Sequence, residues 1–260
     1  CFIPSLIGET LGQLAAWNVM DYNGYTARPV AGVVAKAQLH RPAFLGETLL
    51  LESFIDSLDE SAVQYHSIAR VGQETVFSIE GALGPLLPMQ TFIDEASIKQ
   101  QYQEIYHPGD WSCVCDMSNA SGQSLADVGR FNAPMLFDNI LASEPGLSLV
   151  AEKKITAAAP YFPDHFPNKP VLPMTVLLEC KLNLARYFVR QAGYGVDYEI
   201  KEFRKIKMNE FVVPGDVLIC QLKVKQHSED ELVLSYRSEV NAKRVCVVDV
   251  VLVPKVKTHE

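Results

Sequence analysis

Six stretches of the chain alternate apolar and polar residues, with β-branched residues frequent among the apolar ones. They lie at residues 49–58, 62–71 and 74–83 in the first third, and at 217–226, 231–240 and 244–253 near the end. This two-residue period is typical of strands that bury one face. Short polar turns separate the members of each set, so each set predicts an antiparallel meander.

An apolar helical segment precedes each set of strands. The two segments cover residues 3–15 and 172–185. Each contains a proline, then apolar residues, then one glutamate, which is Glu9 in the first and Glu179 in the second. Four residues later comes an amide, Gln13 or Asn183, which shares a helix face with the glutamate. The sequence therefore predicts two buried helices that each carry one carboxylate.

A second similarity supports an internal duplication. Residues 37–49 and 206–218 each end a strand in a glycine–acid turn, at nearly the same separation as the two helices. The repeated order predicts two units of one helix and one antiparallel sheet, an α+β fold. Residues 94–106 predict a polar connecting helix. The predicted organisation is an N-terminal unit at 1–92, a linker with a polar helix at 93–128 and a C-terminal unit at 129–260.

Composition places the chain among globular proteins. Its 260 residues suffice for one large domain or two ordinary ones, and the net charge of −8 argues against a general nucleic-acid binder. No apolar run reaches the length of a membrane span, and the start has no signal-peptide pattern. The six cysteines include Cys113 and Cys115 in a C-x-C spacing that does not suit zinc. We therefore expect reduced thiols in a cytoplasmic protein.

Residues 160–173 hold one histidine, His165, among five prolines and three aromatic residues. Proline fixes φ and removes backbone donors, so this segment predicts a rigid, extended arm rather than a helix or a central strand. The helix that follows carries Glu179. An imidazole held in one place and a carboxylate on an apolar helix are typical of acid–base chemistry.

The residues from about Arg130 to the end resemble the hotdog-fold 3-hydroxyacyl-[acyl-carrier-protein] dehydratases of fatty acid synthesis, the FabZ- and FabA-like enzymes. The segments that carry the resemblance are, in order, 134–138, 144–146, 162–167, 171–173 and 213–216. Glu179 follows His165 by fourteen residues, which is the spacing of the family's acid.

The first part of the chain resembles the same fold from its helix onward. Glu9 stands at the family's acidic position, but the strand and histidine arm that should precede it are absent, and the sequence begins at Cys1. We therefore expect that residues precede Cys1. The resemblance implies a double hotdog: two antiparallel sheets, each wrapped around a central apolar helix, form a pseudo-dimer within one chain. Further homo-oligomerisation is compatible with it.

The resemblance implies dehydration of a carrier-linked 3-hydroxyacyl thioester to a trans-2-enoyl thioester, in fatty acid or polyketide-type synthesis. His165 would remove the C2 proton, and a glutamic acid, protonated because desolvation raises the pKa of a carboxyl, would protonate the leaving hydroxyl. In dimeric relatives each site takes its histidine and its acid from different units. His165 would then face Glu9, and Glu179 would serve a histidine of the missing arm. No metal or cofactor is implied.

Several further residues are expected to bind the substrate, namely Phe166, Pro173, Met174, Asn183 and Gln13. The two amides either orient the acids or pack between the helices. The family usually has glycine where this chain has Met174, so this side chain would narrow the site, change substrate choice or weaken the backbone donors. The expected partner is an acyl carrier protein or coenzyme A thioester, with no nucleic acid and no membrane span.

Two rival functions remain compatible with the sequence. In a hotdog thioesterase, Glu9 or Glu179 would activate water, although that class usually lacks the His-Phe-Pro arm. A non-catalytic acyl-binding or scaffold domain of a larger synthase would explain both the missing first arm and Met174. Release of free thiol would indicate the thioesterase, and binding without turnover would indicate the scaffold.

Overall fold

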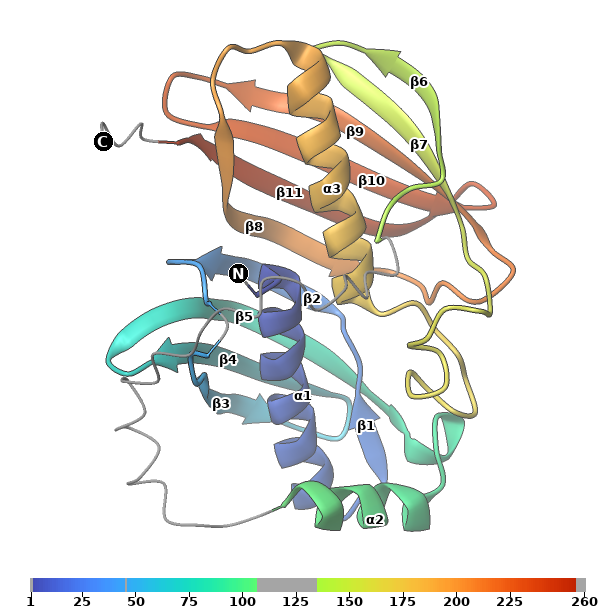
Figure 1. Ribbon diagram of the computed structural model, residues 1–260. Helices are drawn as coiled ribbons and strands as arrows, with labels where there is room; N and C mark the ends of the chain where they lie inside the picture. The colour runs from blue at the N-terminus through green and yellow to red at the C-terminus, as the bar shows by residue number, and fades with distance from the viewer. Residues whose placement is uncertain (1, 45, 107–134, 256–260) are drawn as a thin grey trace.

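The computed structural model describes residues 2–44, 46–106 and 135–255 (Figure 1). Cys1, Cys113, Cys115 and the predicted linker from residue 107 to 128 lie outside the described residues. The helices are α1 (Pro4–Tyr22), the short 3-10 helix η1 (Met89–Thr91), α2 (Glu95–Ile105) and α3 (Met174–Ala192). The N-terminal strands are β1 (Ala27–Pro29), β2 (Val33–Leu39), β3 (Leu50–Leu58), β4 (Ala62–Val71) and β5 (Glu74–Pro88). The C-terminal strands are β6 (Asn139–Glu144), β7 (Ser148–Lys154), β8 (Tyr198–Met208), β9 (Val217–His227), β10 (Leu232–Val240) and β11 (Lys243–Pro254).

The six strands predicted from alternation are confirmed as β3, β4, β5, β9, β10 and β11. Each set forms an antiparallel meander, as the polar turns between its members indicated. The main difference is that β5 continues to Pro88, beyond the predicted end at residue 83. Its last residues are ordered as strand because they pair with the short strand β1.

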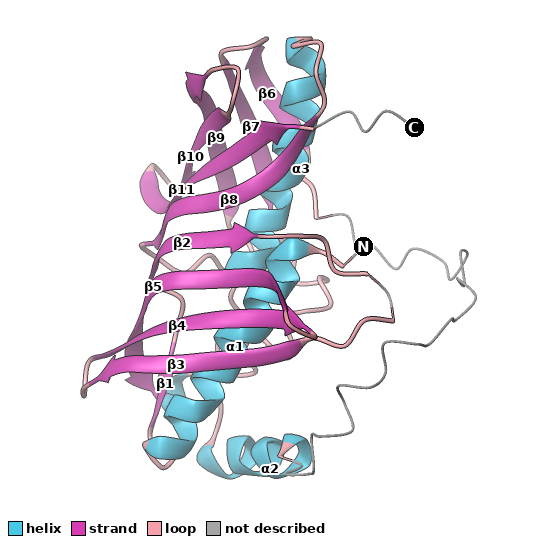
Figure 2. Cartoon of the chain, turned by 90° about the vertical axis from the view of Figure 1, so that its left-hand side faces the viewer, coloured by secondary structure: helices cyan, strands magenta, loops and turns pink. Residues whose placement is uncertain are grey.

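The two sheets predicted side by side, one for each unit, are continuous with each other in the structure. The strands form one sheet in the order β3-β4-β5-β2-β8-β11-β10-β9-β7-β6, with β1 paired to β5 at its side. The two halves join where β2 and β8 pair in antiparallel register, with Ala37 opposite Phe203 (Figure 2). Each of these strands would otherwise be a sheet edge with unpaired backbone groups, and the pairing satisfies both.

The two long helices lie on the same face of this sheet and contact each other (Figures 1 and 2). The first turn of α1 contains Pro4, whose fixed φ suits that position. The last turn of α3 is followed by Gly193 with φ 64°, the left-handed conformation that ends many helices. Both predicted helices are therefore confirmed, and each extends one to two turns beyond its predicted end.

The largest cluster of buried apolar side chains connects the two halves. Its buried side chains come from both long helices and from the strands beneath them, and they include Ile7, Leu11, Phe77, Leu178 and Tyr236. The buried residues of α1 recur about every four positions, which places them on the face toward the sheet. The shared core and the shared sheet hold α1 and α3 in a fixed relation. Within the described ranges, no helix combines the length and apolarity needed to cross a bilayer.

The segment 160–173 is a series of turns, so the prediction of an extended arm is wrong. Proline fixes φ but leaves ψ free, and here the chain folds back on itself. The His165 amide donates to the Tyr161 carbonyl at 3.0 Å, and the His165 carbonyl accepts from the Val171 amide at 2.8 Å. The Asn168 amide donates to the Phe92 carbonyl at 2.9 Å, which ties the segment to the N-terminal half.

Candidate active site

A cavity of about 300 Å³ lies where the N-terminal half meets the turns around His165. Residues from both halves line it. Glu9 and Gln13 come from α1 and Arg28 from β1, whereas His165, Phe166, Met174 and Thr175 come from the C-terminal half. Apolar side chains and prolines make up much of the remaining wall. The site is therefore a product of the contact between the halves, and neither half alone contains it.

The carboxylate of Glu9 is held by two neutral donors. The Gln13 Nε2 donates to Glu9 Oε1 at 2.7 Å, across one helical turn. The Thr175 hydroxyl at the start of α3 donates to Glu9 Oε2 at 2.8 Å. Gln13 therefore contacts the Glu9 carboxylate directly, and the orienting role predicted for it stays a prediction. A carboxyl group oriented by neutral donors in an apolar cavity is well suited to proton transfer.

His165 lines the same cavity as Glu9. Burial lowers the pKa of His165 from its usual value, and the nearby Arg28 charge lowers it further, while the Glu9 carboxylate opposes both by raising it. The net result is an imidazole that favours its neutral form near pH 7. A neutral imidazole can accept a proton, so the electrostatics of the cavity suit a general base.

Arg28 is a feature of the cavity that the sequence did not reveal. Its Nη2 donates to Gln13 Oε1 at 3.4 Å, and its guanidinium carbon lies 4.1 Å from the centre of the Phe166 ring. Burial lowers the pKa of Arg28 to about 10, while the Glu9 charge works in the opposite direction. No sequence pattern marks this residue, because it projects from a strand of three residues outside every motif.

Tyr65 is a second lining residue that the sequence did not single out. It lies on β4 of the N-terminal half, and burial, assisted by the Glu9 charge, raises its pKa to about 12. The phenol therefore stays protonated at neutral pH and faces the cavity as a donor. The alternating pattern of its strand predicts only that the side chain faces inward, and nothing in the sequence marks it as a site residue.

Glu179 lies apart from this cavity, with a different set of partners. The Ser5 hydroxyl donates to Glu179 Oε2 at 3.1 Å, and Arg186 Nη1 donates to Glu179 Oε1 at 3.1 Å. Arg186 also donates to Asn183 Oδ1 at 2.6 Å. Asn183 itself donates to the Met135 carbonyl at 2.9 Å. The structure therefore places Glu179 and Asn183 together, but it does not bring either of them to His165.

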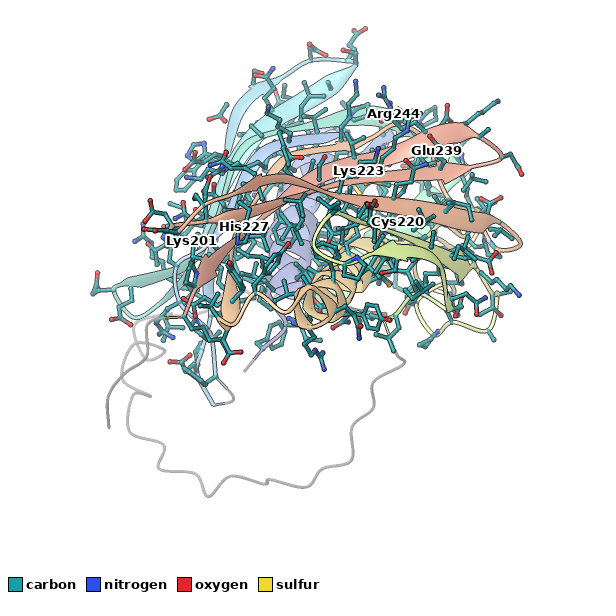
Figure 3. All side chains as sticks on the ribbon, turned by 90° about the horizontal axis from the view of Figure 1, so that it is seen from above. Lys201, Cys220, Lys223, His227, Glu239 and Arg244 are labelled. Atoms are coloured by element: carbon teal, nitrogen blue, oxygen red, sulfur yellow. The ribbon has the colours of Figure 1, made fainter. Side chains whose placement is uncertain are left out.

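The remaining predicted residues divide between the cavity and its surroundings. Phe166 and Met174 line the cavity, whereas Pro173 precedes α3 and is absent from the described lining. The other described histidines lie elsewhere. His40 is near Ser78, and His66 pairs with Asp56. His227 at the end of β9 is 3.0 Å from the Tyr198 hydroxyl, in the sheet of the C-terminal half (Figure 3).

The hydroxyl donors of the two glutamates could have been found from the internal repeat. Ser5 precedes Glu9 by four residues, and Thr175 precedes Glu179 by four residues. Each hydroxyl donates to the glutamate of the other helix, so the pairs cross between α1 and α3. The signal was a hydroxyl at matching positions of the repeat. No cluster of His, Cys, Asp and Glu with the makings of a metal site occurs in the described residues.

The C-terminal half of the chain is similar to known proteins. Residues 132–250 match the family model of the FabA-like domain. The expected resemblance to the FabZ- and FabA-like dehydratases is confirmed. The 3-hydroxyacyl-[acyl-carrier-protein] dehydratase FabZ of Anaeromyxobacter sp. is 38% identical over 96 residues, which are 35% of this chain and 61% of that protein. FabZ of Xanthomonas campestris pv. campestris is 37% identical over 83 residues, which are 30% of this chain and 54% of that protein. The chain thus spans little more than half the length of these relatives.

Solved structures that resemble the whole chain establish the hotdog fold. A protein described as an oleoyl thioesterase from Lactobacillus plantarum has a TM-score of 0.61 at 10% identity, over 98% of this chain and 90% of that one. An acyl-ACP thioesterase from Bacteroides thetaiotaomicron has a TM-score of 0.53 at 11% identity, over 95% of this chain and 88% of that one. At such low identity the likeness concerns the fold alone.

Proposed function

We propose that the protein dehydrates a 3-hydroxyacyl thioester to the trans-2-enoyl thioester, with the acyl chain carried on acyl carrier protein, in fatty acid or polyketide-type synthesis. The observation that carries the proposal is that His165 and Glu9, from opposite halves of the chain, line the same cavity. A dehydration needs one base and one acid on the same substrate, and this cavity contains one group suited to each task.

In the proposed reaction, His165 takes the proton from C2 of the substrate. The electron pair of that C–H bond forms the C2–C3 double bond as the C3–O bond breaks. Glu9 donates its proton to the departing hydroxyl, which leaves as water. A positioned acid or base contributes about a hundred- to ten-thousand-fold in rate. The neutral imidazole that burial favours is the form that this step requires.

The proposal extends to the organisation of the chain. We infer a double hotdog in which residues 1–92 and 129–260 are two units arranged as a pseudo-dimer. The crossed hydrogen bonds between α1 and α3 support this, because each helix donates a hydroxyl to the other's glutamate. The acyl tail would occupy the apolar part of the cavity, which includes Val34, Val63 and Ile79.

A thioesterase is the second candidate, favoured by the fold neighbours that cover the whole length of the chain. In that reaction Glu9 would activate a water molecule, and the products would be a free acid and a free thiol. His165 would have no necessary role in it. The two functions therefore differ both in their products and in their dependence on His165.

The deciding experiment incubates the protein with a 3-hydroxyacyl-carrier thioester and follows the enoyl product and free thiol separately. We expect the enoyl product in the wild type, and a loss of about a thousandfold or more in kcat for His165→Ala. His227→Ala is the matched control, because this imidazole lies outside the cavity lining, and it should retain full activity. Free thiol as the main product, or dehydration that survives His165→Ala, would refute the proposal.

A further inference from the structure

Arg28 occupies an energetically unusual position. Its side chain lies in a residue that is only 7% exposed, and its Nε has no hydrogen-bond partner among the described residues. A guanidinium has five N–H donors, and a buried one normally satisfies most of them. Here the hydrogen bond to Gln13 is long, at 3.4 Å. A cation this deeply buried and this poorly satisfied calls for a partner of its own.

Arg28 borders two cavities, the one that contains His165 and Glu9 and a second one that is lined by Glu104 and Asp164. Phe166 covers one face of the guanidinium at 4.1 Å. Gln13 takes one terminal nitrogen, and it uses its own amide nitrogen to hold Glu9. Arg28 is a lining residue of the cavity that contains His165 and Glu9. Its Nε is buried, so a molecule bound in that cavity would meet the terminal nitrogens of the guanidinium.

The charges of the cavity determine what kind of group fits. Among the described residues that line it, Arg28 is the only lysine or arginine, and the other formal charges belong to the carboxylates of Glu9 and Glu210. When a base removes the C2 proton of an acyl thioester, negative charge moves onto the thioester carbonyl oxygen. That oxygen needs a donor that is already in place, and a buried cation serves this purpose far better than one in water.

We propose that Arg28 binds the thioester carbonyl oxygen of the substrate and stabilises the negative charge that this oxygen gains in the transition state. The inference rests on the dehydratase function proposed above and deepens it. The C3 hydroxyl is the less suitable partner, because Glu9 neutralises the charge that would develop there. In the reaction Arg28 neither gains nor loses a proton. Its N–H groups shorten their contact with the oxygen as the C2–H bond breaks and relax when water leaves.

The proposal gives Arg28 two linked effects on the site. Its direct contact acts on the carbonyl oxygen. Its charge also lowers the pKa of His165, in addition to the larger effect of burial, and so helps to keep the base neutral.

The test measures kcat and KM of wild type, Arg28→Ala, Arg28→Lys and Tyr65→Phe with a 3-hydroxyacyl-pantetheine thioester. Loss of one donor to a developing oxyanion typically lowers kcat by about a hundredfold or more, so we expect this fall in Arg28→Ala with KM little changed. Arg28→Lys keeps the charge without the planar fork and should fall in between. Tyr65→Phe, which removes a different donor from the same cavity, should lose much less.

Chemical rescue separates charge from shape. Millimolar guanidinium added to Arg28→Ala should restore part of kcat, whereas urea, a neutral molecule of similar shape, should restore none at the same concentration. Equal rescue by both, a rise in KM alone, or an unchanged kcat would overturn the proposal. Circular dichroism checks that each variant is folded. If Arg28→Ala is unfolded, Arg28→Met, which keeps the apolar stem over Phe166, takes its place in the kinetic comparison with the same expected loss.

Failure of the dehydratase function would be recognised separately. If the wild type turns over no 3-hydroxyacyl or enoyl thioester, the proposed function has failed, and calorimetric binding of an acyl-pantetheine then tests Arg28 on its own. Weaker binding in Arg28→Ala than in wild type supports a contact with the thioester. Equal affinity of the two proteins refutes it.

Discussion

Glu9 and Glu179 occupy matching positions of two similar helices, yet their surroundings differ. Glu9 is held by an amide and a hydroxyl, and it lines a cavity together with a histidine. Glu179 is 5% exposed and is bonded to a hydroxyl and to the guanidinium of Arg186, with no lining position in that cavity. The Glu9 carboxylate has neutral partners and lines the cavity, whereas the Glu179 carboxylate is buried and forms an ion pair with a partly exposed arginine.

The comparison shows that the helix pattern alone does not determine the chemistry of its glutamate. Both residues follow a proline, both have a hydroxyl four residues before them and both have an amide four residues after them. The difference comes from the groups that surround each carboxylate. The turns around His165 in the C-terminal half line the same cavity as Glu9, whereas Glu179 is bonded to Arg186 of its own helix.

The largest expected contrast comes from the two glutamine variants. Glu9→Gln removes the proposed proton donor and should lower kcat by about a hundredfold or more, with little change in stability. Glu179→Gln should leave kcat within a few-fold but lower the free energy of unfolding by about 1–2 kcal/mol, discounted because Arg186 is partly exposed. Steady-state kinetics and urea denaturation measure the two effects. An active Glu9→Gln with an inactive Glu179→Gln would show that the crossed pairing is wrong.

A smaller contrast is expected between the two hydroxyls. Thr175→Val removes one hydrogen bond to Glu9 while keeping the side-chain shape, and a hydrogen bond of this kind is worth about 1 kcal/mol. We expect kcat to fall about fivefold. Ser5→Ala removes the equivalent bond to Glu179 and should lower the free energy of unfolding by about 1 kcal/mol without affecting kcat. Equal kinetic effects in both variants would remove the distinction between the two sites.

The smallest expected effect concerns pH. Burial lowers the pKa of His165, so the acid limb of kcat/KM should lie below the usual histidine value of about 6.5. As pH falls through that value the unfolded chain binds a proton before the folded one does, so stability should decrease until the pKa of folded His165 is reached. The Glu9 charge raises the pKa of His165, so Glu9→Gln should lower it further while Glu179→Gln leaves it unchanged. Imidazole titration by NMR measures these shifts, and an opposite order would contradict the assignment.

The elements of the fold were largely predictable because their signals are local. The alternation in residues 62–71 and the apolar spacing around Glu9 depend only on neighbouring residues, and both segments formed as expected. The pairing of β2 with β8 was not predictable in this way. Taken within its own half, each strand would lie at the edge of a sheet. The two pair only because the other half offers a second edge strand.

The residues of the candidate site also divide into those that a local sequence signal marks and those that none marks. His165 and Glu9 stand in motifs, so both could be proposed as a pair from the sequence. Arg28 could not, since a three-residue strand offers no periodicity and nothing near it in the sequence resembles a site. The turns at 160–173 were also out of reach, because five prolines restrict φ at their own positions but say little about where the chain between them turns.

The antiparallel register between β2 and β8 has a consequence for how such a site can evolve. Side chains alternate between the faces of a strand, so a shift by one residue would turn the apolar faces away from the helices. The next allowed register is displaced by two residues, about 7 Å along the strand. Because the halves meet at this pairing, the separation of acid and base cannot drift by small increments through the sheet. Small changes in the separation of Glu9 and His165 therefore have to come from side chains and turns, because the sheet allows only steps of two residues.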